Sequence, residues 1–561
     1  MEPTPIQRDI IQKEGNTVVL AMPGSGKTFV LSEKIRRILE SDVLKDYQGV
    51  IAISYTRKAS GHLKRKTLQN GTWEKNSFFG TIDSFCLTQI ILPFGHYVIG
   101  YPKEEVVPIT ERDLDKDRVV DFEWINKIHP DYEKINEPDW ENLYELFKEG
   151  KVLVSSLGLM ALRIIKNCPA CRAHLKARFK YVFIDEFQDA DTYTNGLFLE
   201  LISLGLIGNA VGDVNQSIFG FAHKVSDYLV ALETMEGFTS YKLAENFRCS
   251  IPIVNYSNRL LDVNCQLLEC EGEIGVEHIA VDGDEEIVAE YLDYAIINDC
   301  KKWEVTDFSQ VAILVRSTKM QKMIDGYLDI PHRVVISTPL DDDLNPRSHL
   351  FAQLLQYYFD DGMPFMSVVD SYVDLRMLKS YARKRLLGIR DEIRSVNEDN
   401  MVDALPRLFK DVADILLPKY QEGSSMRYLE EVLDSNDLID SYRPFSVREV
   451  VIMTLHKSKG LEFDIVYHLN MNEFEIPIKK YMNGVAYYPD EMQDLDLHYV
   501  GVTRAKKLCV LVSNSIRHNS KGEAKNGEPS VFLSRNGVET LRNNYSYCIE
   551  QNYNRMVEDC K

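Results

Sequence analysis

The chain has 561 residues, of which 45% are hydrophobic and 27% are charged, and its formal net charge is −20 at pH 7. This composition is typical of a globular protein with several domains. The sequence has no run of 18 apolar residues and no basic N-terminus followed by an apolar run, so we expect a cytoplasmic protein without a membrane span or secretory signal. The negative charge argues against nucleic acid, but binding depends on the local field. Basic residues gather at 57–58 and 64–66.

The first predicted element is a buried strand, because residues 16–20 are apolar and rich in β-branched side chains. A loop with two glycines follows, and residues 29–35 have a helical pattern. Strand, loop and helix in this order are typical of a phosphate-binding loop, in which backbone N–H groups close around phosphates at the positive end of a helix. The predicted nucleotide-binding residues are Ala21, Met22, Pro23, Gly24, Ser25, Gly26, Lys27 and Thr28.

Two residues of this loop carry side-chain chemistry. We expect Lys27 to reach the β and γ phosphates and the Thr28 hydroxyl to hold Mg²⁺. Ala21 takes the place of the first glycine of the strict pattern, and its small side chain should fit.

Ten cysteines are scattered along the chain, and Cys168 and Cys171 form its only CxxC pair. One interpretation is a zinc or iron–sulfur site, to which His174 lies close in sequence. Such a site normally needs a second cysteine pair or nearby histidines. The other interpretation, which the spacing favours, is a pair of structural thiols in a reducing compartment.

A second nucleotide element is predicted where the apolar run 181–184 ends in Asp185 and Glu186. Two adjacent carboxylates at the tip of a buried strand are costly to bury without partners. Beside a phosphate-binding loop, a role at a metal and a triphosphate explains them. We expect Asp185 to bind Mg²⁺ through water and Glu186 to orient and deprotonate the attacking water.

The segment from Asp185 to Asp189 resembles the second conserved motif of the UvrD/Rep/PcrA helicases of superfamily 1. Other motifs of that family follow in the same order, and so many ordered matches exclude chance. The resembling segments are 5–8, 53–60, 80–86, 211–221, 243–248, 452–463, 499–506 and 529–533. The resemblance implies two RecA-like cores that bind ATP and Mg²⁺ between them and single-stranded or tailed DNA across them.

The resemblance also implies roles for single residues. It implies that Gln7 and Phe247 contact adenine, that Glu462 contacts the ribose and that Gln216 senses the γ-phosphate. Arg248 and Arg504 match arginine fingers, with surface ion pairing as the alternative. The residues matching DNA-facing positions are Thr56, Arg57, Thr81, Phe221, Thr454 and His456. Phe221 stands where the family has a base-stacking tryptophan, and packing in a core is its alternative.

The sequence departs from the family pattern at several positions. Asp83 stands where a histidine is common, Phe29 replaces an arginine often found after the phosphate-binding loop, and Ala222 replaces an arginine that usually follows the third motif. The last two changes remove positive charge from nucleotide and DNA contacts. We therefore hypothesise weaker affinity or dependence on a partner, which tight, DNA-stimulated ATP turnover by the isolated protein at physiological salt would contradict.

The motif order predicts an α/β fold of two RecA-like domains with parallel sheets, each interrupted by a mostly helical insertion. The predicted divisions are a first core at 1–90 and 165–255 with an insertion at 91–164, a second core at 256–340 and 445–535 with a shortened insertion at 341–444, and a tail at 536–561. Strands are expected at 308–316, 450–455 and 507–512 of the second core, and the tail is expected to form a docking helix.

Two functions remain open at this point. The first is an ATP-dependent single-stranded DNA translocase and 3′-to-5′ helicase, with polarity implied by the resemblance alone. The second is a regulatory ATPase subunit that senses DNA ends and controls a nuclease partner, because helicase subunits of anti-phage systems such as Gabija have a similar size and trimmed insertions. A plain P-loop signalling NTPase would leave the later motifs unexplained.

Overall fold

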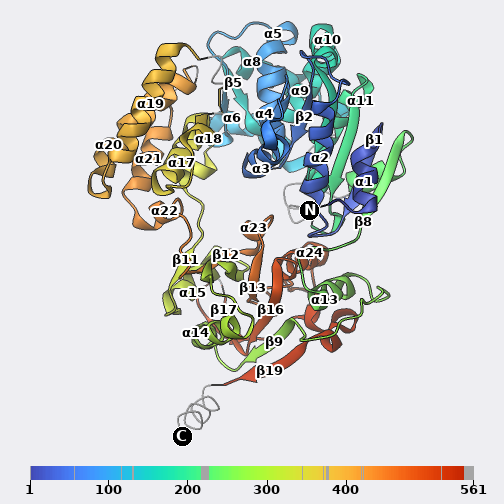
Figure 1. Cartoon of the computed structure of the whole chain (residues 1–561), viewed down its shortest axis with the longest axis vertical. Coiled ribbons are helices and arrows are strands. Elements are labelled where there is room, and N and C mark those ends of the chain that lie inside the picture. Colours follow the sequence, from blue (N-terminus) through green and yellow to red (C-terminus); the bar gives the residue numbers. More distant parts are fainter. Residues whose placement is uncertain are drawn as a thin grey trace.

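The structure is a computed structural model with two α/β cores, the first drawn above the second in Figure 1, and each core contains one large sheet. A helical insertion, residues 339–440, lies beside the first core. The fold class predicted from the sequence is therefore confirmed. The described residues are 2–55, 57–114, 116–128, 132–216, 227–343, 345–369, 372–373, 378–418, 420, 422–519 and 521–548.

Six parallel strands form the first sheet in the order β3-β2-β6-β7-β1-β8. They are β1 (Asn16–Ala21), β2 (Gly49–Ile53), β3 (Phe78–Gly80), β6 (Phe179–Ile184), β7 (Ile207–Gly212) and β8 (Phe238–Leu243). All five residues of β2 are buried, as expected for a strand covered on both faces. Because β6, β7 and β1 are neighbours, the loops that follow them meet at one sheet edge.

Helices cover both faces of this sheet, and most of the first insertion is helical too. The helices of the core are α1 (Pro5–Gln12), α2 (Lys27–Glu40), α3 (Arg57–Thr67), α4 (Ile82–Phe85), α10 (Pro169–Arg178), α11 (Thr192–Ser203) and α12 (Asp227–Glu233). The insertion contributes α5 (Leu92–Val98), α6 (Lys116–Val119), α7 (Glu123–Ile128), α8 (Glu137–Lys148) and α9 (Leu157–Asn167), with the short parallel strands β4 (Val107–Ile109) and β5 (Lys151–Leu153). The insertion shares one hydrophobic core with the first sheet.

Seven parallel strands form the second sheet in the order β11-β12-β10-β13-β16-β9-β19. They are β9 (Val276–Val281), β10 (Val311–Val315), β11 (His332–Val334), β12 (Val450–Thr454), β13 (Phe463–His468), β16 (Ala505–Asn514) and β19 (Asn543–Tyr547). The helices of this core are α13 (Ile251–Leu261), α14 (Glu285–Lys302), α15 (Thr318–Tyr327), α23 (Leu455–Ser458) and α24 (Glu491–Val502). Two hairpins, β14 (Lys480–Met482) with β15 (Val485–Tyr487) and β17 (Ile516–His518) with β18 (Ala524–Asn526), follow β13 and β16.

The second insertion packs around a hydrophobic core of its own. Its helices are α16 (Pro339–Asp342), α17 (Pro346–Phe359), α18 (Phe365–Val369), α19 (Ser380–Ser395), α20 (Met401–Leu416), α21 (Ser425–Leu433) and α22 (Asn436–Asp440). None of the helices in the described part of the chain combines the length and the apolar character that crossing a membrane requires.

Three features of the second core differ from the sequence predictions. The expected docking helix is wrong for Asn543–Tyr547, which form the edge strand β19 beside β9. The strand expected at 308–316 begins only at Val311, because residues 308–310 form a 3₁₀ turn. Helix α13 begins at Ile251, inside the segment predicted for the first core. Its side chains Ile253 and Tyr256 instead pack in the core of the second sheet, which sequence periodicity does not reveal.

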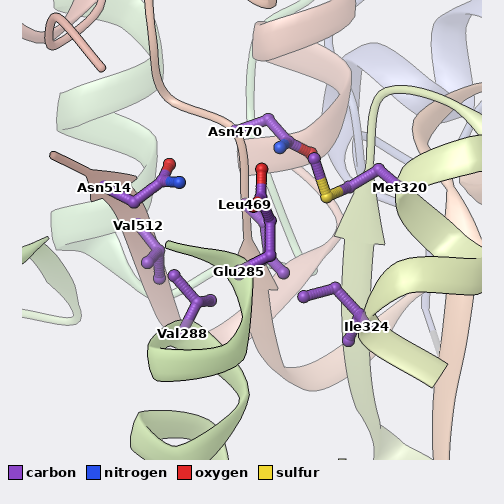
Figure 2. Close-up of a pocket in the computed structure, with 8 residues that line it drawn as sticks. All are labelled: Glu285, Val288, Met320, Ile324, Leu469, Asn470, Val512 and Asn514. Carbon is purple, nitrogen blue, oxygen red and sulfur yellow. The ribbon is translucent and has the colours of Figure 1, made fainter. Parts of the chain in front are cut away.

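A small cavity lies between the starts of α14 and α15 and the ends of β13 and β16 (Figure 2). The cavity measures about 10 Å³, which is room for about one water molecule. Figure 2 shows the side chains that line it: Glu285, Val288, Met320, Ile324, Leu469, Asn470, Val512 and Asn514. This cavity is therefore too small for a nucleotide.

A buried lysine lies behind the phosphate-binding loop. Lys34 of α2 is 3% exposed, and its ammonium donates to the hydroxyl of Thr17 at 3.2 Å. Burial, with the repulsion of Arg37 and Lys13, lowers the pKa of Lys34 from 10.5 to about 7. Between about pH 7 and pH 10.5 the unfolded chain therefore binds more protons at this position than the folded chain does. The free energy of unfolding falls as the pH drops from 10.5 to 7 and changes no further below that.

We predict that Lys34→Met raises the free energy of unfolding at pH 7 by about 2–4 kcal/mol. Methionine keeps the apolar volume and removes the penalty of burying a charge, while Thr17 keeps its bond to the Gly15 carbonyl. Denaturant unfolding at pH 7 and pH 10 measures the effect, with the exposed Lys45→Met as the matched control. The gain should shrink at pH 10, and an equal gain at both values would show that the buried charge is not its cause.

Candidate active site

The loop after β1 has the backbone that a phosphate requires. Gly24 and Gly26 have φ values of +68° and +86°, in the left-handed region that favours glycine. A Cβ atom on Gly24 would lie 2.6 Å from the Cβ of Arg248, so a larger residue does not fit there. Gly26 caps α2 without a side-chain hydrogen bond, which leaves the first N–H groups of that helix open to an anion.

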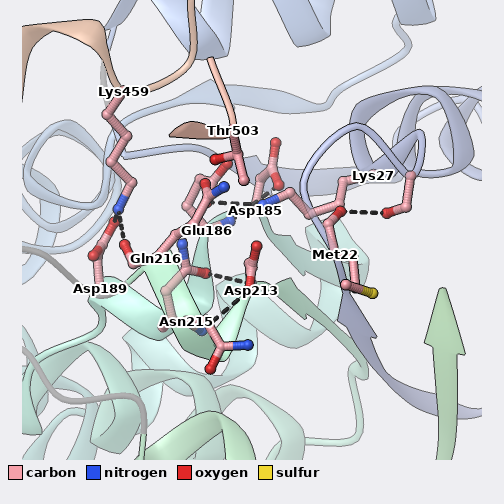
Figure 3. A network of polar contacts seen from close by, with 12 residues as sticks. Met22, Lys27, Asp185, Glu186, Asp189, Asp213, Asn215, Gln216, Lys459 and Thr503 are labelled. Carbon is pink, nitrogen blue, oxygen red and sulfur yellow. Dashed lines mark hydrogen bonds and ion pairs between the residues drawn. The ribbon is translucent and has the colours of Figure 1, made fainter. Parts of the chain in front are cut away.

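Lys27 begins α2 and turns toward the carboxylates at the end of β6 (Figure 3). Its ammonium lies 3.2 Å from a carboxylate oxygen of Glu186. Burial alone would lower the pKa of Lys27, but Glu186, Asp213 and Asp185 together raise it. The amine is therefore firmly charged, and Glu186 is its ion-pair partner in this structure.

Asp185 and Glu186 follow β6 and behave differently. Glu186 has φ +55° and ψ +42°, a strained conformation for a residue with a side chain. Burial and the neighbouring Glu186 raise the pKa of Asp185. Burial opposes ionisation of Glu186, but Lys27, Lys459 and the amide of Gln188 outweigh it and lower its pKa. Glu186 is thus the ionised member of the pair in this structure.

The loop after β7 adds polar atoms that lack protein partners. The N–H of Asp213 donates to the side-chain oxygen of Gln188 at 3.0 Å, and the N–H of Asn215 donates to Asp213 at 3.0 Å. Within the described residues, the amide nitrogen of Gln216 and one carboxylate oxygen of Asp213 are buried without a hydrogen-bond partner. Such orphaned groups are costly unless a ligand satisfies them, so the residues here fit a triphosphate with its cation.

One lysine of the second core contacts two residues of the first core. Lys459 follows α23, and its ammonium lies 2.6 Å from a carboxylate oxygen of Asp189 and 2.7 Å from the carbonyl of Gln216 (Figure 3). The Asp189 side chain is fully buried, and burial raises its pKa to about 6 against the attraction of Lys459. Asp496 of α24 faces the same region, and burial together with Asp213 raises its pKa to about 8.

We predict that Lys459→Met destabilises the chain by about 3–5 kcal/mol, because the Asp189 carboxylate would stay buried without its cation. Adding Asp189→Asn should recover most of the loss, since the pair is then removed together. Denaturant unfolding of the two single variants and the double variant measures the coupling. A double variant no more stable than Lys459→Met would contradict the pairing.

The two predicted arginine fingers lie near each other: Arg248 follows β8 beside the phosphate-binding loop, and Arg504 belongs to the second core. Nε of Arg248 lies 2.8 Å from a carboxylate oxygen of Glu462, and the Arg248 guanidinium also donates to the carbonyl of Thr503 at 3.4 Å. Arg504 is 1% exposed and donates at 3.1 Å to each of two carbonyls, those of Val500 and Leu461. Burial, with the repulsion of Arg248, lowers the pKa of Arg504 to about 9.

These contacts test the alternative interpretation of the two arginines, which is surface ion pairing. Arg504 does not form a surface ion pair, because it is buried and its guanidinium donates to two carbonyls and to the hydroxyl of Thr503. Arg248 does form an ion pair, and its partner is Glu462, itself a predicted ribose contact. Two residues expected to touch nucleotide therefore hold each other in this structure.

A cavity of about 220 Å³ opens beside the phosphate-binding loop. Its lining is Thr4, Ile6, Gln7, Ser25, Lys242, Leu243, Ala244, Glu245 and Phe247. Gln7 is buried and donates to the Ser25 carbonyl at 3.0 Å, and the N–H of Phe247 donates to the Gly24 carbonyl at 2.9 Å. Phe247 is 49% exposed, so its ring is accessible to a planar base. The cavity therefore brings together the two residues predicted for adenine.

The predicted DNA residues are only partly described. Thr56 and Phe221 lie outside the described residues, as does Ala222, and Arg57 is described only as the first residue of α3. Thr81 follows β3 and accepts from the N–H of Ser84 at 3.3 Å. Thr454 ends β12, and His456 lies in α23. Burial, with Arg316 and Lys459 nearby, lowers the pKa of His456 to about 4, so its ring is neutral at pH 7.

The structure also shows the surroundings of two other sequence features, the CxxC pair and Phe29. Cys168 accepts from the N–H of Cys171 at 3.4 Å, so its sulfur caps α10, and both thiols are buried. No group of three or more metal-ligating side chains occurs in the described ranges. Phe29, which stands in place of an arginine, packs partly buried against the core of the first sheet.

Sequence reasoning missed four charged residues of this region. Asp189, Asp213, Lys459 and Asp496 were given no role, although the first three lie inside the motif segments. A signal for Asp213 was present, since it directly follows the apolar strand β7 as Asp185 follows β6. The contact of Lys459 with Asp189 spans 270 positions, and nothing local in the sequence pairs them.

Comparison with known proteins gives matches along most of the chain. Two family models match, an AAA domain at residues 7–222 and a UvrD-like helicase C-terminal domain at residues 359–515. The Gabija protein GajB of Bacillus cereus (strain VD045) is 24% identical, covering 91% of this chain and 95% of that protein. DNA helicase II of Escherichia coli (strain K12) is 23% identical, covering 92% and 85%. ATP-dependent DNA helicase Rep of Buchnera aphidicola is 21% identical, covering 88% and 90%.

Proposed function

Because the chain resembles the UvrD-like helicases along most of its length, we propose that it is an ATP-driven translocase on single-stranded DNA that unwinds duplexes from 3′ to 5′. The observation that carries the proposal is the division of the site between the cores. Lys27, Asp185 and Glu186 belong to the first core, Arg504 belongs to the second, and Lys459 already joins the two. A site completed from two sides couples nucleotide turnover to movement of the cores.

The residues present fit ATP with Mg²⁺. Adenine would enter the cavity beside Gln7 and Phe247, and the phosphates would meet the open N–H groups at the start of α2. Thr28 and Asp185 would hold Mg²⁺, which supplies positive charge at the β and γ phosphates. The side-chain amide of Gln216, unpartnered among the described groups, would then find an acceptor on the γ-phosphate.

Binding of the triphosphate rearranges the charges of this structure. Lys27 would leave Glu186 for the phosphate oxygens, which frees the ionised Glu186 to accept a proton from the attacking water. Arg248 would exchange Glu462 for the γ-phosphate, and Glu462 would then be free to accept from the ribose. After the terminal phosphate is split off, these partners return and the cores move apart again.

Turnover of ATP with and without single-stranded DNA tests the proposal. We expect DNA to stimulate hydrolysis, and we expect strand displacement from duplexes with a 3′ tail but not from those with a 5′ tail. A rate of ATP hydrolysis that does not change when single-stranded DNA is added would refute the proposed motor activity. Displacement that requires a 5′ tail would refute only the polarity.

A second candidate is a regulatory ATPase subunit that senses DNA ends and controls a nuclease. The similarity to the Gabija protein GajB over nearly the full length of both chains favours it, as does the compact second insertion of residues 339–440. DNA-stimulated hydrolysis without strand displacement by the isolated chain would support this candidate over the first. A nuclease that copurifies with the chain and changes its cutting rate when ATP is present would support it further.

A further inference from the structure

Two histidines meet inside the second core, between its sheet and α24. His468 ends β13 and His498 lies in α24, and neither side chain is exposed. Nδ1 of His498 lies 3.1 Å from Nε2 of His468, and Nδ1 of His468 lies 3.1 Å from the carbonyl of Leu469. Because a carbonyl can only accept, Nδ1 of His468 carries the hydrogen. Its Nε2 therefore accepts, and His498 is the donor across the pair.

Both rings are neutral at pH 7. Burial lowers the pKa of His468 to about 4, and burial with the repulsion of His468 and Arg542 lowers the pKa of His498 well below its ordinary value. Within the part of the chain that the structure describes, Nε2 of His498 is buried without a partner. Leucines at both positions would leave no nitrogen unpartnered, so the histidines cost stability. What they supply is a directional contact between a strand and a helix.

The same face of α24 comes very close to His468. Gly501 follows His498 by three positions, so the two residues lie on one face of the helix. A Cβ atom on Gly501 would lie 2.6 Å from Cδ2 of His468 and 2.7 Å from Cδ2 of Leu455. Glycine therefore lets the helix backbone rest on both side chains, and the hydrogen bond of His498 fixes how the helix is rotated there.

This contact lies between the predicted DNA residues and a predicted arginine finger. Leu455 separates Thr454 from His456, and both of these match DNA-facing positions. Arg504 follows α24 by two positions, and its carbonyl accepts from the N–H of Phe463, the first residue of β13, at 2.9 Å. Strand β13 therefore holds the segment that ends in Arg504 at both of its own ends. Helices α23 and α24 lie on the side of the second core that faces the first (Figure 1).

We propose that the His468–His498 hydrogen bond is a positioning contact that fixes the rotation of α24, so that DNA bound at Thr454 and His456 moves Arg504 toward the nucleotide. The inference rests on the proposed function, because it needs DNA at these two residues and ATP beside Arg504. Both histidines are fully buried, so neither contacts DNA or nucleotide itself. Their role is to convert a displacement of α23 into a displacement of the end of α24, through packed side chains and one hydrogen bond.

The ratio of ATP turnover with saturating single-stranded DNA to turnover without DNA tests this contact in the full chain. We expect His498→Leu to lower the ratio at least fivefold, while the affinities for single-stranded DNA and for a fluorescent ATP analogue stay within twofold. His498→Asn should restore at least half of the ratio, because its amide N–H lies about where Nδ1 lies and can donate to His468. A loss of stability alone would slow both rates together and leave the ratio unchanged.

Two further variants separate positioning from stability. His468→Leu with His498→Leu removes both partners and fills the space, so it should be at least as stable as the unaltered chain and still have the low ratio. Tyr467→Phe is the matched control on the opposite face of β13, where the Tyr467 hydroxyl donates to Asp299 at 2.5 Å. It also removes a buried hydrogen bond, and it should lower the unfolding temperature but keep the ratio.

The outcomes separate this inference from the proposed function. If DNA leaves turnover by the unaltered chain unchanged, the proposed function is refuted, and the inference with it. If DNA stimulates the unaltered chain and the double leucine variant equally, only the inference is refuted. Equal falls in the two rates of His498→Leu would also overturn it. A low ratio in both leucine variants that His498→Asn relieves would support it.

Discussion

Replacing Arg504 with glutamine should lower ATP turnover by about 10³- to 10⁵-fold, because an arginine supplied from the opposite core neutralises charge that develops on the transferred phosphate. The affinity for ATP should stay within about fivefold, since the adenine cavity and the phosphate-binding loop belong to the first core. Turnover at saturating single-stranded DNA and equilibrium binding of a fluorescent ATP analogue measure the two effects.

The structure sets the controls for this variant. Arg504 also ties the end of α24 to Leu461 through a carbonyl, so thermal unfolding must show that the glutamine variant stays folded. Arg443→Gln removes an arginine that lies just after α22 and pairs with Glu398, and it should leave turnover unchanged. A folded Arg504→Gln variant with normal turnover would show that Arg504 is not part of the catalytic machinery.

Much of the fold was predictable because its signals are local. The strand at Asn16–Ala21, the glycine loop and the start of α2 lie within a single stretch of the sequence, and each follows from side-chain type and spacing. β19 gave no such signal. Its sequence Asn-Asn-Tyr-Ser-Tyr has no aliphatic residue and is only five residues long, because an edge strand is only half covered and needs less burial. Its place beside β9 is set by tertiary packing.

The candidate site was predictable residue by residue but not in its present arrangement. The sequence pointed to Arg248 and Glu462 separately, each toward nucleotide, whereas the structure pairs them with each other. The same holds for Lys27, which was expected at the phosphates and lies on Glu186. Partners of this kind depend on which charged groups lie within reach in three dimensions, and a motif pattern does not record those distances.

Glu186→Gln should lower turnover by about 10²- to 10⁴-fold, because the amide cannot accept the proton of the attacking water. Nucleotide affinity should rise several-fold at the same time. The substitution removes a negative charge beside the triphosphate and releases Lys27 from the ion pair at 3.2 Å. It also lowers the pKa of Asp185, since Glu186 is one cause of that elevation, and a more fully ionised Asp185 binds Mg²⁺ better.

Turnover should fall while nucleotide affinity rises, and these opposite signs distinguish the loss of a catalytic base from a distortion of the site. A distorted site would lose turnover and affinity together, whereas removal of the base alone slows hydrolysis and tightens binding. Single-turnover hydrolysis and titration with an ATP analogue, each at pH 7, report the two quantities. Glu200→Gln removes one carboxylate from an ion pair with Arg172 on the same core and should change neither. If Glu186→Gln hydrolysed ATP at the normal rate, the proton would have another acceptor, and Asp213, buried with an unpartnered oxygen among the described residues, would be the next to test.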